Sequence, residues 1–154
     1  MDKGSYALLY RLKNTRKIDV GSLGRISFPA GYYVYLGSAF GPGGLKRVKR
    51  HRRLSQEGEG STHWHIDYIS EDCSSELLRA YLIPGKDVEC FMASELSGDM
   101  ATELKGFGCS DCGCNSHLIS YRTEEAASEE IEKLLDSLET GYRIKNFITR
   151  SNDN

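Results

Sequence analysis

Apolar and polar positions divide the chain into short extended segments and a few helical ones. Aromatic and aliphatic side chains crowd residues 6–12, 24–28, 32–36 and 77–83, which predicts strands. Residues 45–54 and 128–138 place their apolar side chains at helical spacing, and residues 88–96 also favour a helix. We therefore expect an α/β (α+β) domain, in which a small antiparallel sheet is flanked by helices.

Other segments give weaker signals. Residues 13–17 form a polar turn, and residues 63–69 are too short to decide between a strand and a helix. Residues 106–115 hold too many Gly and Cys residues for regular structure, and 117–121 fits a last edge strand. We expect one domain over residues 4–121, and a C-terminal amphipathic helix and tail at 122–154 that pack on it.

Composition narrows the class of protein. The 154 residues suffice for one hydrophobic core, and no apolar run approaches the roughly 18 residues that cross a bilayer. The first residues lack the apolar stretch of a secretory signal, so we expect a cytoplasmic protein without a membrane partner. Five cysteines, an odd number, favour reduced thiols or metal ligands over a disulfide framework.

The sharpest motif joins Gly4-Ser5-Tyr6 to a second stretch, residues 33–39 (YVYLGSA), and then to a basic helix that begins after a glycine-rich turn. This order resembles the GIY-YIG nuclease superfamily. The resemblance is closest to its DUF123 branch, sometimes grouped as Uri-type endonucleases, and covers residues 4 to about 121. It is carried by Leu23-Gly24-Arg25, residues 28–33 (FPAGYY), residues 63–68 (HWHIDY) and Ser110-Asp111-Cys112.

The resemblance implies a metal-dependent endonuclease that hydrolyses phosphodiester bonds in DNA or RNA. Its positions correspond to Tyr6, Tyr35, Arg47 and His51 as catalytic residues. A glutamate, Glu89 or its competitor Glu95, would hold Mg²⁺ or Mn²⁺. An arginine can clamp phosphate oxygens, and a histidine titrates near neutrality, as a proton acceptor should. Each tyrosine taken singly also fits ordinary strand packing.

A basic segment follows the second tyrosine motif. It hides within a net charge of −2, because residues 124–139 are strongly acidic. A row of cations without acids between them neutralises phosphates in a sequence-independent way, so we expect a nucleic-acid partner, with DNA favoured over RNA. The candidate nucleic-acid-binding residues are Lys46, Lys49, Arg50, Arg52 and Arg53. The alternative is a solvated helix face.

Two further groups of residues could hold a metal. His63, His65 and Asp67 would share one face if they lay on a strand, but would not converge on a helix. The alternatives are that they support the cleft of the nuclease or form structural hydrogen bonds. The soft ligands Cys112, Cys114 and His117, with Cys109 close by, could bind Zn²⁺ or remain reactive thiols. Two other functions therefore stay open: a non-catalytic nucleic-acid-binding module with a GIY-YIG-like fold, and a zinc or redox interaction module centred on residues 109–117.

Overall fold

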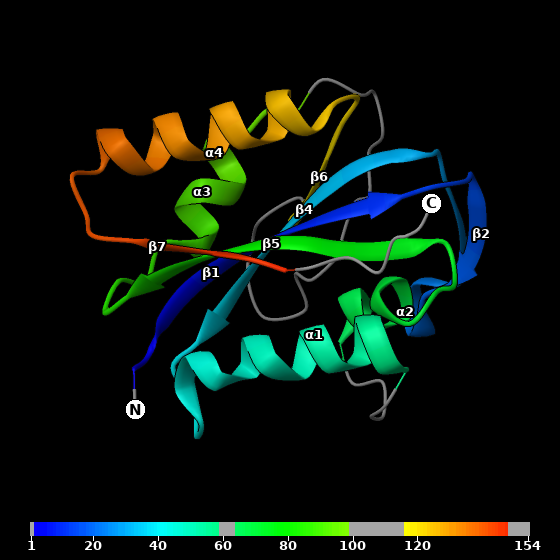
Figure 1. Cartoon of the computed structure of the whole chain (residues 1–154), viewed down its shortest axis with the longest axis horizontal. Coiled ribbons are helices and arrows are strands. Elements are labelled where there is room, and N and C mark those ends of the chain that lie inside the picture. Colours follow the sequence, from blue (N-terminus) through cyan, green and yellow to red (C-terminus); the bar gives the residue numbers. More distant parts are fainter. Residues whose placement is uncertain (1, 59–63, 99–115, 148–154) are drawn as a thin grey trace.

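The computed structural model describes residues 2–58, 64–98 and 116–147, and its centre is a five-stranded antiparallel sheet. The strand order is β6-β4-β1-β5-β7 (Figure 1). The strands are β1 (Gly4–Leu12), β4 (Gly31–Ala39), β5 (Ser75–Pro84), β6 (Leu118–Tyr121) and β7 (Arg143–Asn146). A separate two-stranded sheet pairs β2 (Arg16–Asp19) with β3 (Arg25–Phe28), on either side of the 3₁₀ turn η1 (Gly21–Leu23).

Helices cover both faces of the large sheet (Figure 1). The 3₁₀ turn η2 (Gly44–Lys46) leads into α1 (Arg47–Glu57), which covers one face together with α2 (His65–Ser70). The other face packs against α3 (Glu89–Glu95) and α4 (Glu124–Ser137). The expected α+β class, with an antiparallel sheet flanked by helices, is confirmed.

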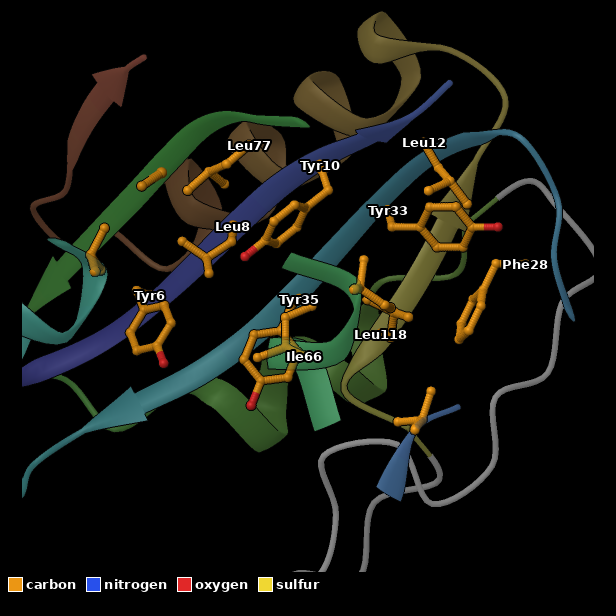
Figure 2. Packing of buried hydrophobic residues seen from close by; sticks show 14 of the residues in the cluster. Tyr6, Leu8, Tyr10, Leu12, Phe28, Tyr33, Tyr35, Ile66, Leu77 and Leu118 are labelled. Carbon is orange, nitrogen blue, oxygen red and sulfur yellow. The ribbon is translucent and has the colours of Figure 1, made fainter. Parts of the chain in front are cut away.

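The sequence of the central strand β1 is almost continuously apolar because the strand is buried on both faces. Its side chains alternate between the two faces, and both faces are covered. Tyr6, Leu8 and Tyr10 point into the core beneath α1 and α2 (Figure 2), whereas Ala7 and Leu9 belong to the core beneath α3 and α4. A strand buried on both sides has no solvent face, so polar alternation is not required.

Local signals set the ends of the two longer helices. Gly43 has φ +90° and Gly58 has φ +69°, in the left-handed region that glycine adopts without strain, and they bracket the segment from η2 to α1. The hydroxyl of Thr123 accepts a hydrogen bond of 3.0 Å from the Ala126 N–H and caps α4. These residues fix where the basic helix and the acidic helix begin or end.

Some expectations about the fold were wrong. The polar turn expected at residues 13–17 overlaps β2, which was not expected. The strand at 118–121 does lie at an edge, but it is not the last one, because β7 follows α4 and pairs with β5. All four β7 residues are exposed, so the segment lacks an apolar pattern and is a strand through its backbone pairing. Of residues 63–69, which fit either a strand or a helix, residues 65–69 belong to the helix α2.

Candidate active site

Tyr6 and Tyr35 come from the neighbouring strands β1 and β4 and lie near each other, with ring centroids 6.5 Å apart. In the β1–β4 register, Tyr6 stands opposite Gly37. A Cβ at position 37 would lie 2.5 Å from the Tyr6 hydroxyl oxygen and 2.6 Å from its Cε1, distances that real side chains do not reach. Glycine follows Tyr35 by two residues because the ring of Tyr6 occupies the space of a side chain there.

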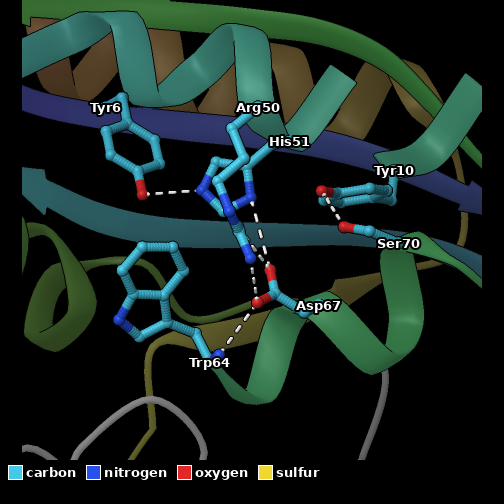
Figure 3. Close-up of polar contacts among 7 residues, drawn as sticks. All are labelled: Tyr6, Tyr10, Arg50, His51, Trp64, Asp67 and Ser70. Atoms are coloured by element: carbon cyan, nitrogen blue, oxygen red, sulfur yellow. Dashed lines mark hydrogen bonds and ion pairs between the residues drawn. The ribbon is translucent and has the colours of Figure 1, made fainter. Parts of the chain in front are cut away.

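His51, on α1, is hydrogen-bonded to Tyr6. Its Nε2 lies 2.9 Å from the Tyr6 hydroxyl, and its side chain is 0% exposed (Figure 3). Burial lowers the pKa of His51 to about 4; the Asp67 carboxylate opposes this shift, and Arg50 and Arg47 add to it. His51 is therefore neutral at pH 7. Its Nδ1 faces Asp67 Oδ1 at 3.8 Å, which favours the Nδ1–H tautomer with Nε2 accepting the Tyr6 proton.

Arg47, the first residue of α1, is fixed beside the tyrosines. Its Nη1 donates to the carbonyl oxygen of Ser38 at 2.6 Å, and its guanidinium lies 4.8 Å from the centre of the Trp64 ring. Burial raises the pKa of Tyr6 strongly, while the charge of Arg47 and a hydrogen bond with it oppose that shift. The tyrosine thus remains protonated at neutral pH with a cation within reach of its oxygen.

Glu89 opens α3 and brings a carboxylate to the same place. Burial, and then the charge of Asp87, raise the pKa of Glu89, whereas a hydrogen bond with Ser38 and the charge of Arg47 lower it. The Glu89 charge also acts on Tyr6 and Tyr35. Its Oε2 lies 3.6 Å from Nδ1 of His117. Of the two glutamates considered from the sequence, Glu89 is the one beside Arg47, and Glu95 is exposed.

Asp67, which is 0% exposed, and Arg50, which is 26% exposed, form an ion pair next to this group. Both Asp67 carboxylate oxygens accept from Arg50, at 3.0 and 2.8 Å, and Oδ2 also accepts from the Trp64 N–H at 2.9 Å (Figure 3). The Arg50 guanidinium lies 4.5 Å from the Trp64 ring centre. Arg50 is therefore held by protein groups, and it anchors α2 to α1.

A metal site formed by His63, His65 and Asp67 is not supported, because His65 and Asp67 lie on the helix α2. That hypothesis required a strand, in which alternate residues share a face. His65 is half-buried, and burial lowers its pKa; Asp67 is 0% exposed and bound to Arg50, and His63 lies outside the described residues.

The remaining cations of the basic helix point elsewhere. Lys46, Lys49, Arg52 and Arg53 line a cavity between α1 and β7, whereas Arg47 and His51 face the tyrosines. The helix thus divides its basic residues between two sides.

Of the residues proposed to bind Zn²⁺, only His117 lies within the described part of the chain. Cys109, Cys112 and Cys114 lie outside the described residues, while His117 is buried with its Nε2 3.8 Å from the Sγ of Cys90. Among residues 2–58, 64–98 and 116–147, no three His, Cys, Asp or Glu side chains gather in a group that could hold a metal by themselves. A site with one protein carboxylate and water ligands is not of that kind.

One residue of this site, Ser38, was not singled out in the sequence, and the role of another, Asp67, was left open. Ser38 contacts both Arg47 and Glu89, and it sits inside the second tyrosine motif, so its position was the available signal. Asp67 was considered as a metal ligand or as a support of the cleft; its actual partner is Arg50, a pairing that joins two helices and has no local sequence signal.

One family comparison places the chain. The model of a family described as "Domain of unknown function DUF123" matches residues 5–140. The chain belongs to the DUF123 family. The match spans the elements from β1 to α4 and ends before β7. Searches of curated proteins and of solved structures found no match for this DUF123 chain. Within the described residues, no helix has the length and apolar character needed to cross a bilayer.

Proposed function

We propose that this DUF123 chain is a divalent-metal-dependent endonuclease that hydrolyses phosphodiester bonds of DNA or RNA. The observation that carries the proposal is the convergence of Tyr6 from β1, Arg47 and His51 from α1, and Glu89 from α3 within one network of contacts. Together with Tyr35, these are the residues that the resemblance to GIY-YIG nucleases assigns to catalysis. A histidine, a tyrosine, an arginine and a carboxylate gathered at one place, with shifted pKa values, form a candidate catalytic site.

The residues fit a Mg²⁺ or Mn²⁺ ion held by one carboxylate. Glu89 supplies hard oxygen ligands, and its side chain keeps 22% of its surface exposed, which leaves access for water and substrate phosphate. Mg²⁺ commonly keeps several waters and uses only one or two protein carboxylates. When bound, the metal would offset negative charge on the reacting phosphate and the leaving oxygen.

The protein side chains have distinct roles in the proposed hydrolysis. Water attacks phosphorus, the new O–P bond forms, and the bond to the leaving oxygen breaks. Arg47 stabilises charge on the phosphate oxygens. Tyr6 takes the proton of the water as it gives its own to Nε2 of His51, which is neutral and 2.9 Å away. Asp67 then faces the protonated imidazole, and Tyr35 positions the phosphate.

A second candidate is a nucleic-acid-binding module without turnover. It is favoured by the burial of the proton-transfer pair, because Tyr6 is 2% exposed and His51 is 0% exposed. A water would have to reach the tyrosine hydroxyl from the Arg47 and Glu89 side for hydrolysis to occur. This candidate predicts binding that does not change when Glu89 loses its charge.

The test is cleavage of labelled single-stranded, duplex and branched DNA and RNA under single-turnover conditions, with Mg²⁺ or Mn²⁺ and with EDTA. Arg47→Ala should slow cleavage roughly 10²–10³-fold, the usual loss for one group that stabilises transition-state charge. Glu89→Gln should abolish the cleavage that Mg²⁺ or Mn²⁺ supports in the parent. Glu95→Gln, on the exposed side of the same helix, is the matched control and should cut normally.

The outcomes separate the two candidates. Cleavage by Arg47→Ala at the parent rate would refute the nuclease assignment. Salt-sensitive binding without cleavage on any substrate, unchanged in Glu89→Gln, would establish the non-catalytic module instead.

A further inference from the structure

A groove on the other side of α1 from Tyr6 and His51 is lined by residues of that helix and of the edge strand β7. Its volume is about 710 Å³. Leu45, Val48 and Leu82, each less than 10% exposed, form its floor, and Phe147 forms part of its wall. The Phe147 N–H donates to the carbonyl oxygen of Leu78 at 3.0 Å, so the pairing of β7 with β5 continues to this residue and fixes the wall.

The rim of the groove is strongly basic. Two carboxylates, Asp2 and Glu57, also line it, and Arg143 pairs with Asp2 at 3.1 Å. Within the described part of the chain, the other cations of the rim make no ion pair within 4.0 Å. The six cations are Lys46, Lys49, Arg52, Arg53, Arg143 and Lys145. Cations outnumber carboxylates six to two in this lining, and a cleft lined mainly by one sign of charge over an apolar floor concentrates oppositely charged ligands.

The groove combines cations with surfaces that suit aromatic rings. The Arg52 guanidinium already lies 5.3 Å from the centre of the Phe147 ring, an arrangement that leaves an aromatic and cationic wall above aliphatic side chains. Phosphates need only the cations. A floor of Leu45, Val48 and Leu82 favours a ligand that also brings an apolar ring.

We propose that this groove binds an unpaired segment of nucleic acid, with phosphates on the basic rim and a base against Phe147 and the aliphatic floor. Bases within a duplex are stacked and paired, so their faces cannot enter the groove, whereas a single strand exposes them. A volume of about 710 Å³ lies in the range of pockets for small ligands, and suits one or two nucleotides.

This inference rests on the proposed function and specifies its substrate class. Arg47 and His51 lie on the side of α1 that faces the tyrosines, and an α-helix with its side chains is about 10 Å across. A nucleic acid that contacts both places must pass over the helix. The substrate is therefore one with an unpaired tail or flap beside the phosphate that is cleaved.

The experiment measures binding of a short, fluorescently labelled oligothymidylate by anisotropy, as a function of salt. Lys49→Gln combined with Arg52→Gln should weaken binding at least tenfold and reduce the slope of log K against log salt by about 1.4, because each phosphate contact to a single strand contributes about 0.7. Lys133→Gln, on the exposed face of α4, is the matched control and should bind as the parent does. All these residues are exposed, so the variants should keep the parent's unfolding midpoint.

A second comparison tests the base. An abasic oligonucleotide of equal length keeps the phosphates, and should bind roughly tenfold more weakly than oligothymidylate. Phe147→Leu should remove most of that difference. Equal binding of the two oligonucleotides by the parent, equal competition by polyglutamate, or unchanged binding in the Lys49 and Arg52 double variant would each overturn the proposal.

Failure of the groove and failure of the nuclease give different results. If oligothymidylate binds as expected but the parent cuts no substrate, the proposal for the groove is supported and the nuclease proposal is wrong. If cleavage depends on Arg47 but the double variant cuts blunt and tailed duplexes with the parent's preference, the nuclease stands and the groove falls.

Discussion

Neutral burial of His51 makes the stability of the protein depend on pH. The pKa of His51 is lowered by burial to about 4, from a reference value of 6.5. Below pH 6.5 the histidine binds a proton in the unfolded chain, whereas in the folded protein it stays neutral down to about pH 4. The contribution of His51 to the free energy of unfolding is therefore present in full above pH 6.5 and is lost as pH falls towards 4. The slope is about 1.4 kcal/mol per pH unit in this window.

The size of the effect follows from the two pKa values. The whole shift corresponds to roughly 3 kcal/mol, of which about 2 kcal/mol is lost between pH 7.5 and pH 5. No solvent screening reduces this figure, because the His51 side chain is 0% exposed. A loss of this size is a large share of the 5–15 kcal/mol that stabilises a typical domain.

Urea unfolding of the parent and of His51→Gln, at pH 7.5 and at pH 5, isolates the contribution. Carboxylates also begin to titrate as pH falls to 5, but they do so in both proteins. The quantity to compare is therefore the change in the free energy of unfolding between pH 7.5 and pH 5, measured for the parent and for His51→Gln. We expect the parent to lose about 2 kcal/mol more than His51→Gln. His65→Gln, which alters a half-buried histidine, should follow the parent closely. Equal losses in the parent and His51→Gln would refute a neutral, buried His51.

Two other substitutions test the packing of the site. Gly37→Ala should displace the Tyr6 ring, lower stability by roughly 1–3 kcal/mol and abolish cleavage, because its Cβ would lie 2.6 Å from Tyr6 Cε1; parent-like urea unfolding would contradict the register. Asp67→Asn should cost roughly 2–4 kcal/mol at pH 7, since it removes the carboxylate charge, 0% exposed, that pairs with Arg50, whereas Asp19→Asn breaks a surface pair and should cost less than about 1 kcal/mol in the same urea assay.

Much of the fold was predictable because it depends on local patterns. The apolar runs at β1 and β5, the helical spacing of α1 and α4, and the glycine turn before η2 all act over a few residues, so their elements were expected within small boundary shifts. β7 could not be found this way. Its four residues are exposed, and only the backbone partners offered by β5 make them a strand.

The candidate site shows the same division. The sequence alone determined the resemblance that selects Tyr6, Tyr35, Arg47 and His51, since the motifs that carry it are contiguous. It left Glu89 and Glu95 open, because the register of α3 against the sheet involves contacts far apart in the chain. Tertiary structure alone decided that Glu89 lies beside Arg47 and Ser38, and that Arg50 is taken up by Asp67. The tertiary structure also decided that Lys49, Arg52 and Arg53 of α1 line the groove beside β7, because a helix presents different residues to each of its neighbours.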